Sequence, residues 1–278
     1  MQITMYNGKH ITIPDHLVVF QPEIETLQRS TPWLTEFFQR NSLDNFSYLD
    51  GVMSIRKLCS NGLADLIDKQ YSSYLDPLGG VGIDAMLFQQ DPTKTHINEI
   101  DPACLEVLRV NFPHAHITSL DFFDRESRGK LLSCSPDLVF LDYNKYTPTH
   151  YGKDDVYSNA VSDCFNSTQK FLIINDVGVH HLQYGKRSYA NYSRILGKTI
   201  TNIHEYFGAV GEWYHDHFPE WYLTDVNHFR YTGKGTGTEL ASFQLFRKIP
   251  TPHHLRINFF GKDELRLHPK YPVLRLED

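Results

Sequence analysis

The chain has no long apolar run, no paired cysteines and no excess of positive charge. None of its apolar segments approaches the roughly 20 residues that a helix needs to cross a bilayer. Its four cysteines are scattered without a Cys-x-x-Cys pair, so neither a zinc site nor a disulfide framework is indicated. The first residues lack a basic stretch followed by an apolar run, the pattern of a secretory signal. We therefore expect a soluble, intracellular protein in a reducing compartment, the cytoplasm.

Charge is distributed unevenly along the chain. The 278 residues carry a formal net charge of −6, which provides no overall attraction to nucleic acid or to an anionic membrane. Between Phe229 and Arg275, however, nine Lys and Arg stand against three acids. This basic segment fits either an ordinary solvated surface or a face that binds phosphate groups.

The most informative stretch runs from Tyr71 to Asp142. A short apolar run leads into Asp76, a glycine cluster follows up to Gly82, and a helix-like segment comes next. Glu99 stands seventeen residues after Gly82, at the end of a second short run. Glycines let a backbone approach a ligand closely, and an acid roughly 20 residues further on is placed to hold ribose hydroxyls. The pattern predicts a strand, turn, helix and strand that bind a nucleoside cofactor.

Two cofactor classes, or an ordinary turn without a ligand, are compatible with these glycines. The dinucleotide fingerprint Gly-x-Gly-x-x-Gly fits only if Ala85 replaces its last glycine. The run from Asp76 to Gly82 instead resembles the first motif of class I S-adenosylmethionine-dependent methyltransferases. It is most similar to the Asp-Pro-Phe-Cys-Gly-x-Gly version found in many nucleic-acid methyltransferases. Leu78 and Gly79 stand where that version usually has Phe and Cys.

Three later segments follow in the order that this resemblance requires. Residues 98–102 resemble the second motif, in which an acid at the end of a strand binds the ribose hydroxyls. Residues 116–122 resemble the strand whose end offers an acid to the adenine amino group and an apolar side chain to its face. Residues 136–142 look like a buried strand that ends in an acid, Asp142, as in the fourth motif.

The resemblance implies an α/β fold with a doubly wound, Rossmann-like methyltransferase sheet, S-adenosylmethionine as cofactor, and direct transfer of its methyl group. The glycine turn would hold the amino-acid part of the donor, Glu99 its ribose, and Asp121 with Phe122 its adenine. The candidate donor-binding residues are Asp76, Pro77, Leu78, Gly79, Gly80, Gly82, Glu99, Ile100, Asp121 and Phe122.

The acceptor side departs from the family pattern. Methyltransferases that act on exocyclic amino groups usually show Asp-Pro-Pro-Tyr, whereas here Asp142 is followed by Tyr-Asn-Lys-Tyr. The catalytic candidates are Asp142, which would meet the acceptor, Tyr143, which could stack on a planar substrate, and Lys145, which could act electrostatically or as a base. The two missing prolines leave oxygen, ring nitrogen and protein side-chain acceptors open.

Alternating patterns at residues 222–231 and 240–246 predict an antiparallel hairpin. In the methyltransferase sheet such a hairpin lies beside the fifth strand, and dinucleotide dehydrogenases lack it. Lys186 and Arg187 are expected in a loop that borders the ligand crevice, where they and the basic C-terminal region would contact RNA or DNA. The aromatic segment 212–221 fits a lid or a partner surface. Its His-Asp-His run lacks a third ligand at a telling spacing, so no metal site is expected.

These patterns predict a helical lead-in over residues 1–70, an S-adenosylmethionine-binding core over 71–249 and a basic tail over 250–278. The predicted function is methyl transfer, with nucleic acid as the leading acceptor. The alternatives are a non-catalytic methyltransferase-like binding or assembly subunit, methylation of a protein or small molecule, and an aminopropyl transferase of the spermidine-synthase kind. The last would need paired acids for a polyamine, and Asp142 has no acidic neighbour in the sequence.

Overall fold

The structure is a computed structural model. It describes residues 2–4, 10–12, 63–64, 66–80, 82–142, 156–175, 186–233, 237–251 and 254–260. Near the N-terminus, β1 (Gln2–Thr4) and β2 (His10–Thr12) form a two-stranded antiparallel sheet.

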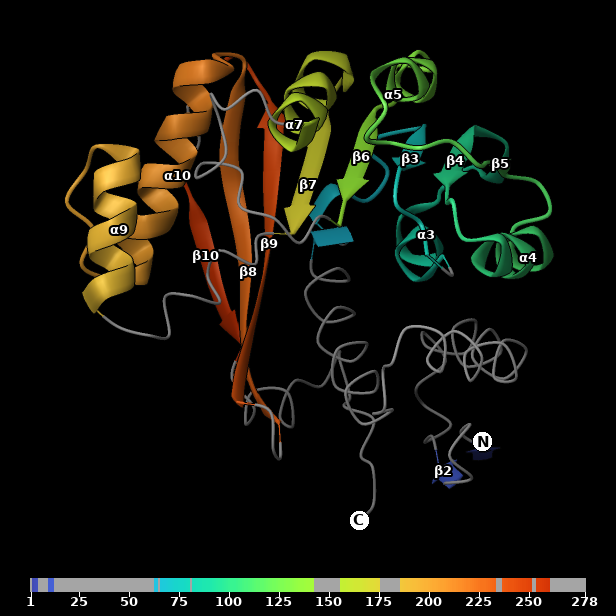
Figure 1. Cartoon of the computed structure of the whole chain (residues 1–278), viewed down its shortest axis with the longest axis horizontal. Coiled ribbons are helices and arrows are strands. Elements are labelled where there is room, and N and C mark those ends of the chain that lie inside the picture. Colours follow the sequence, from blue (N-terminus) through green and yellow to red (C-terminus); the bar gives the residue numbers. More distant parts are fainter. Residues whose placement is uncertain are drawn as a thin grey trace.

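An eight-stranded sheet forms the centre of the fold, in the order β10-β8-β9-β7-β6-β3-β4-β5 (Figure 1). Its strands are β3 (Tyr74–Asp76), β4 (Thr95–Asn98), β5 (His116–Thr118), β6 (Leu138–Leu141), β7 (Phe171–Asn175), β8 (Trp221–Gly233), β9 (Gly237–Lys248) and β10 (Arg256–Phe260). Strands β3 to β7 pair in parallel, whereas β9 runs antiparallel to both of its neighbours, β7 and β8.

This arrangement confirms the predicted α/β fold class. The hairpin β8–β9 lies beside β7, the fifth of the parallel strands, as the methyltransferase sheet requires. Parallel strands buried on both faces contain nearly continuous apolar runs. All four residues of β6 are buried, with Leu138 and Phe140 facing one core and Val139 and Leu141 facing the other.

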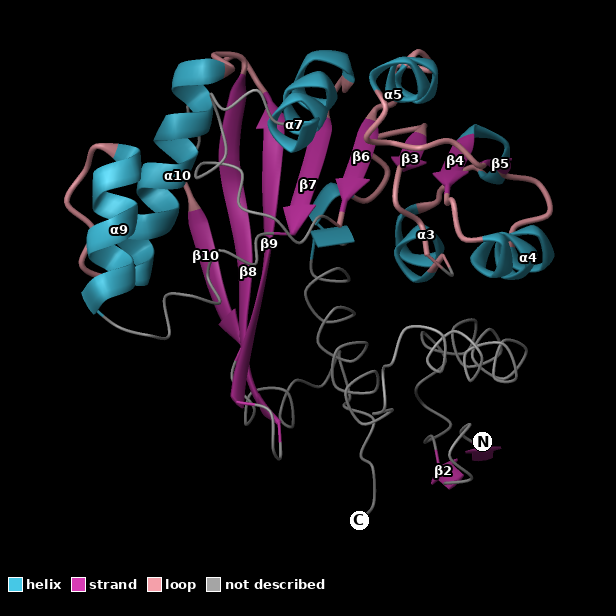
Figure 2. Cartoon of the chain, in the orientation of Figure 1, coloured by secondary structure: helices cyan, strands magenta, loops and turns pink. Residues whose placement is uncertain are grey.

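Helices cover both faces of the sheet (Figure 2). Residues of α5 (Arg125–Leu132), α7 (Val156–Ser167), α9 (Lys186–Leu196) and α10 (Ile203–His217) pack into one core. Residues of α3 (Ile83–Phe88) and α4 (Pro102–Asn111) pack into the other, and the 3-10 turn η2 (Pro92–Lys94) precedes β4. No helix in these described ranges is long and apolar enough to cross a membrane.

Side-chain caps fix where two of these helices begin. The Asp124 carboxylate accepts a hydrogen bond from the Ser127 N–H at 2.8 Å and starts α5. Asn202 accepts one from the Glu205 N–H at 3.0 Å and starts α10. Glu205 in turn accepts from the Thr201 N–H at 2.7 Å, so the chain that enters α10 is held from both directions.

Strand β10 lies within the predicted tail and was not expected from the sequence. It pairs in parallel with β8 and places Arg256 opposite Asp225. The Arg256 Nε donates to the fully buried Asp225 carboxylate at 2.7 Å. At the other boundary, Leu63 and Ile67 of the predicted lead-in are completely buried in the α3–α4 core. Both predicted flanking regions therefore contribute to the packed domain.

Candidate functional site

The loops that follow β3, β4 and β5 meet at one edge of the sheet, because parallel strands end on the same side. The loop after β3 is the glycine turn. Within it the Leu78 N–H donates to the Asp76 carboxylate at 3.2 Å, and the Gly82 N–H donates to the Gly79 carbonyl at 2.8 Å. Gly80 and Gly82 adopt φ values of +52° and +86°, which side chains other than hydrogen rarely permit.

Two glycines of the turn are required by close packing. A Cβ atom on Gly79 would lie 2.3 Å from the Ile97 side chain of β4. A Cβ atom on Gly82 would lie 2.3 Å from the Phe112 ring, just beyond α4. The turn is therefore pressed against the next strand and helix, which fixes its position relative to the loop after β4.

Glu99 connects the glycine turn to its own loop. One carboxylate oxygen accepts the Gly80 N–H at 2.8 Å, and the other accepts the N–H groups of Ile100 and Asp101 at 2.7 and 2.8 Å. Three hydrogen bonds to an ionised carboxylate are strong and directional. They hold Glu99 at the predicted ribose position. The next side chain, Ile100, is 61% exposed, which is unusual for a large apolar residue in the described part of the chain.

Asp76 lies beneath the turn rather than on its surface. It is 2% exposed, and the Tyr74 hydroxyl donates to its carboxylate at 3.2 Å. Burial, together with the charges of Asp76 and Asp84, raises the pKa of Tyr74 well above its usual value, so the phenol keeps its proton. Asp76 thus supports the turn from inside, and its direct contact with a donor stays a prediction. Pro77 is also buried, while Leu78 is half-buried.

The loop after β5 contains the predicted adenine site. Strand β5 ends at Thr118, earlier than the predicted end at residue 122. Asp121 is exposed, and its carboxylate accepts the Phe123 N–H at 2.9 Å. Phe122 is only 2% exposed and belongs to the core, with Phe123 packed against it. The adenine roles of Asp121 and Phe122 stay predictions, and Asp121 is the more accessible of the two.

Arg128 binds the backbone of this loop from its buried side, and the sequence analysis did not predict this role. Its side chain is 3% exposed and donates to the Phe122 and Phe123 carbonyls, both at 3.2 Å. Its Nε also donates to the Asp163 carboxylate of α7 at 2.8 Å. A guanidinium has five N–H donors in a rigid fork, which suits a clamp on several oxygens.

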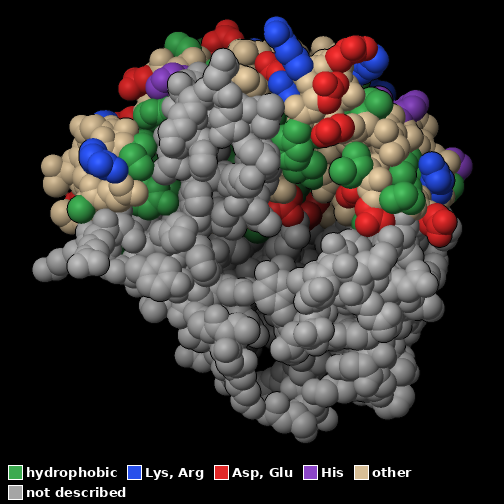
Figure 3. Space-filling view, viewed as in Figure 1, with side chains coloured by type: hydrophobic (Ala, Val, Ile, Leu, Met, Phe, Trp, Pro, Cys, Tyr) green, Lys and Arg blue, Asp and Glu red, His purple; other side chains and the backbone are tan. Residues whose placement is uncertain are grey.

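The acceptor side has a pair of polar side chains at the ends of β6 and β7. The Asn175 Nδ2 donates to the Asp142 carboxylate at 2.7 Å. Asn175 is 6% exposed, and its own carbonyl oxygen has no hydrogen-bond partner in the structure as described. Figure 3 shows acidic side chains where the coloured surface borders the grey region, on the side toward which these strands point. Tyr143 and Lys145 lie outside the described residues.

The predicted nucleic-acid contacts are only partly placed. Lys186 and Arg187 begin helix α9, so the prediction that they occupy a loop was wrong. In the basic C-terminal segment, Arg256 and Arg247 lie 2.7 and 3.8 Å from Asp225, and Lys248 lies 3.0 Å from Glu220. These three cations are neutralised by acids. The contact with RNA or DNA stays a prediction that depends on the other basic residues.

The aromatic segment 212–221 forms the end of α10 and the start of β8. Tyr214 and Trp221 are buried around Phe165, so they are core residues and the expectation of a lid was wrong for them. His215 stacks on Tyr222 with ring centroids 4.3 Å apart. Among the described residues no three His, Cys, Asp or Glu side chains gather in a way that could hold a metal ion.

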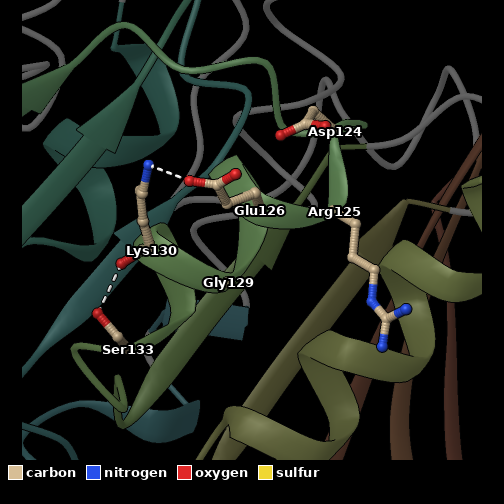
Figure 4. A pocket seen from close by; sticks show the side chains of 6 residues that line it. All are labelled: Asp124, Arg125, Glu126, Gly129, Lys130 and Ser133. Carbon is tan, nitrogen blue, oxygen red and sulfur yellow. Dashed lines mark hydrogen bonds and ion pairs between the residues drawn. The ribbon is translucent and has the colours of Figure 1, made fainter.

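A surface hollow beside α5 provides no ligand site. Figure 4 shows that its lining side chains come from this one helix and its cap. Lys130 pairs with Glu126 at 2.7 Å, and the Ser133 hydroxyl donates to the Lys130 carbonyl at 2.7 Å. Polar groups that already satisfy one another leave little to recognise a ligand, so we assign no function to this hollow.

Comparison with known proteins gives a likeness of fold. No family model and no curated protein matches the sequence. A protein from Pyrococcus horikoshii, provisionally named an RNA methyltransferase, is 12% identical over 68% of this chain and 81% of its own, with a TM-score of 0.40. A Listeria monocytogenes protein, provisionally named a class I S-adenosylmethionine-dependent methyltransferase, is 11% identical over 75% of this chain and 64% of its own, with a TM-score of 0.46.

A third similar structure is an O-methyltransferase from Bacillus cereus in complex with S-adenosylhomocysteine. It is 12% identical over 68% of this chain and 80% of its own, with a TM-score of 0.39. At such identities and TM-scores, nothing about activity or acceptor follows from these proteins. The strand order and the reversed β9 decide the fold class. The fold is that of the class I methyltransferases.

Proposed function

We propose that the protein binds S-adenosylmethionine at the ends of β3, β4 and β5 and transfers its methyl group to an acceptor held near Asp142. The observation that carries this proposal is the contact between the Gly80 N–H and Glu99 at 2.8 Å. It joins a glycine turn, suited to the amino-acid end of the donor, to an acid suited to its ribose.

The residues at this edge fit the three parts of the donor. Gly80 is half-buried next to Glu99 and has open space where a Cβ atom would lie. The exposed Ile100 gives an apolar surface beside the ribose position. Asp121 at the adjoining loop is accessible for an exocyclic amino group. This arrangement supports Glu99, Ile100 and Asp121 as donor contacts, with Asp76 and Pro77 as buried supports of the turn.

When bound, the donor would supply an activated methyl group on its positive sulfur. The protein's contribution is then alignment of donor and acceptor, which can lower a reaction barrier substantially without a covalent intermediate. Asp142, oriented by the Asn175 amide at 2.7 Å, would hold the acceptor at the ends of β6 and β7. Tyr143 would stack on a planar acceptor, and Lys145 would assist electrostatically.

Nucleic acid is the leading acceptor class in this proposal. Support comes from the Asp-Pro start of the glycine motif and from Lys186 and Arg187 at the start of α9. A cytoplasmic location is part of the same proposal, and the scattered cysteines support it.

Calorimetric titration tests the donor first. S-adenosylmethionine and S-adenosylhomocysteine should bind, NAD should not, and Glu99→Ala should abolish binding of the first two. Labelled donor is then incubated with RNA, DNA and protein fractions to find the acceptor. Absence of binding by both sulfur ligands would refute the proposal and favour a non-catalytic subunit. Binding of NAD alone would indicate a dehydrogenase.

A further inference from the structure

One buried side chain, Asn98, touches the loops on both sides of its own strand. It is the last residue of β4 and is 1% exposed. Its Nδ2 donates to the Pro77 carbonyl in the glycine turn at 3.1 Å. The same nitrogen donates to the Leu120 carbonyl in the loop after β5 at 2.9 Å.

The carbonyl oxygen of the same amide is equally occupied. It accepts the Leu120 N–H and the Thr118 hydroxyl, both at 2.9 Å. An amide side chain has two N–H donors and one oxygen with two lone pairs, so all four of its hydrogen bonds are made. The Asn98 backbone takes part as well, because its carbonyl accepts the Gly79 N–H at 2.9 Å.

These contacts join the three segments that the proposed function assigns to the donor. Pro77 belongs to the turn for the amino-acid part, Glu99 follows Asn98 directly, and Leu120 precedes Asp121 at the adenine position. Within the described residues, the Glu99 carboxylate bonds to the glycine turn and to its own loop, and makes no hydrogen bond to the loop after β5. Among the described side chains at this edge, Asn98 is the one that bonds to both flanking loops.

We propose that Asn98 is a positioning residue that sets the spacing between the amino-acid end and the adenine end of the donor site. It does not touch the donor itself, since it is buried beneath the three loops. Buried, fully satisfied polar groups favour one arrangement of the backbone over its alternatives. A ligand that spans all three loops depends on that spacing, whereas a ligand that contacts fewer of them depends on it less. This inference rests on the proposed donor site.

The experiment uses the full chain and the near-isosteric variant Asn98→Leu, which removes all four side-chain hydrogen bonds. Calorimetry measures binding of S-adenosylhomocysteine, which spans the site, and of 5′-methylthioadenosine, which lacks the amino-acid end. We expect the variant to lose affinity for the first ligand by about tenfold or more and for the second by a smaller factor. Thr118→Val removes one of the four bonds and should give smaller losses of affinity. The loss should again be larger for S-adenosylhomocysteine than for 5′-methylthioadenosine.

Thr95→Val is the matched control. Thr95 is fully buried at the other end of the same strand, where its hydroxyl donates to the Asp91 carbonyl at 2.9 Å. The substitution also removes a buried hydrogen bond of β4, but far along the strand from the three loops. It should lower the melting temperature and leave both affinities unchanged.

Three outcomes would overturn the inference. In the first, a folded Asn98→Leu binds S-adenosylhomocysteine as tightly as the wild type. In the second, Asn98→Leu loses affinity for both ligands by the same factor, or Thr95→Val loses as much affinity as Asn98→Leu. Either result would mean that a general loss of stability, and not the spacing of the loops, weakens binding. If Asn98→Leu does not fold, Thr118→Val decides between these results. In the third, the wild type binds neither ligand, and the proposed function fails together with the inference.

Discussion

Two parts of the sheet differ in how completely their polar groups are paired: the proposed donor edge, formed by the loops after β3, β4 and β5, and the proposed acceptor edge, formed by the ends of β6 and β7. At the donor edge, Glu99 and Asn98 together accept or donate seven hydrogen bonds from their side chains. At the acceptor edge, the Asn175 carbonyl oxygen is buried without a partner in the described structure. A buried polar atom without a partner destabilises a protein by about 1–3 kcal/mol. The polar side chains of the donor edge are therefore already paired before a ligand binds, whereas the acceptor edge retains an oxygen that can still accept a hydrogen bond.

The largest effect should come from removing the charge at the donor edge. Glu99→Gln keeps the size of the side chain but replaces the carboxylate that meets three N–H groups. Affinity for S-adenosylhomocysteine should fall by about 100-fold, since charged hydrogen bonds are roughly twice as strong as neutral ones. The control is Glu106→Gln on the exposed side of α4, which should bind S-adenosylhomocysteine with the affinity of the wild type. An unchanged affinity in Glu99→Gln would show that the paired carboxylate of Glu99 does not contribute to donor binding.

A second variant loosens the donor edge from beneath. Arg128→Met removes the donors to the Phe122 and Phe123 carbonyls and the ion pair with Asp163. Unfolding free energy should fall by about 2 kcal/mol, because two carbonyls lose a buried partner. Denaturant titration checks this value. Lys130→Met breaks the exposed pair with Glu126 in the same helix and should change stability by less than about 1 kcal/mol. Equal losses of unfolding free energy in Arg128→Met and Lys130→Met would contradict a special role of the buried Arg128 contacts.

A third variant addresses the acceptor edge alone. Asn175→Leu removes the N–H that holds Asp142 and the unpartnered carbonyl oxygen. Methyl transfer should fall by about tenfold while affinity for the donor stays unchanged, because one hydrogen bond to a charged group is lost. The readout is incorporation of labelled methyl groups into the acceptor fraction found active.

The control for this variant is Thr168, which lies between α7 and β7, before the start of β7. Thr168→Val removes a buried hydroxyl that also has no partner in the described structure, so stability should not fall and transfer should be maintained. A drop in donor affinity in Asn175→Leu would show that the two edges are not separate.

The smallest effect concerns neither edge. His96 of β4 stacks on His116 of β5 with ring centroids 4.6 Å apart. Burial, and the charge of His116 second, lower the pKa of His96 from its usual value of 6.5. The folded state therefore binds this proton less readily than the unfolded chain, and stability should fall as the pH drops below 6.5.

Urea unfolding at neutral pH and near pH 5 measures this dependence. His96→Gln should show a shallower pH dependence than the wild type, whereas substitution of the exposed His114 by Asn should not. Donor affinity should be the same in both variants at neutral pH. An identical pH dependence in His96→Gln would exclude His96 as its source.

Local patterns predicted the strand, turn, helix and strand of the proposed donor edge, which the structure confirms as β3, the glycine turn, α3 and β4. The turn from Asp76 to Gly82 and Glu99 lie close together in the sequence, and their contact with a donor stays a prediction. The burial of Phe122 was missed because β5 ends at Thr118, so alternation along the strand no longer governs the following side chains. The four-way bonding of Asn98 could not be foreseen either, since a strand pattern does not specify what an amide meets across two loops.

The residues missed elsewhere act over long separations in sequence. Asn175 lies 33 residues from Asp142, and Arg128 lies 35 residues from Asp163. No periodicity links such positions, and only the order of the strands brings them together. The same holds for β10, which follows a proline-rich stretch and has only five residues. Besides the backbone pairing, two side-chain contacts join it to β8, from Arg256 to the buried Asp225 and from Asn258 to Asn227.

That buried Asp225 has a consequence for how the chain is made. During synthesis the carboxylate leaves the ribosome 31 residues before Arg256, its closest ionic partner. Until Arg256 follows, strand β8 is the outermost strand of the eight-stranded sheet. Among the described residues, Asp225 then has the Thr224 hydroxyl at 2.8 Å and the cation of Arg247 at 3.8 Å beside it. A buried charge without its partner is strongly unfavourable. Packing at this side of the sheet therefore waits until β10 has been made, and a chain that ended before Arg256 should be less stable.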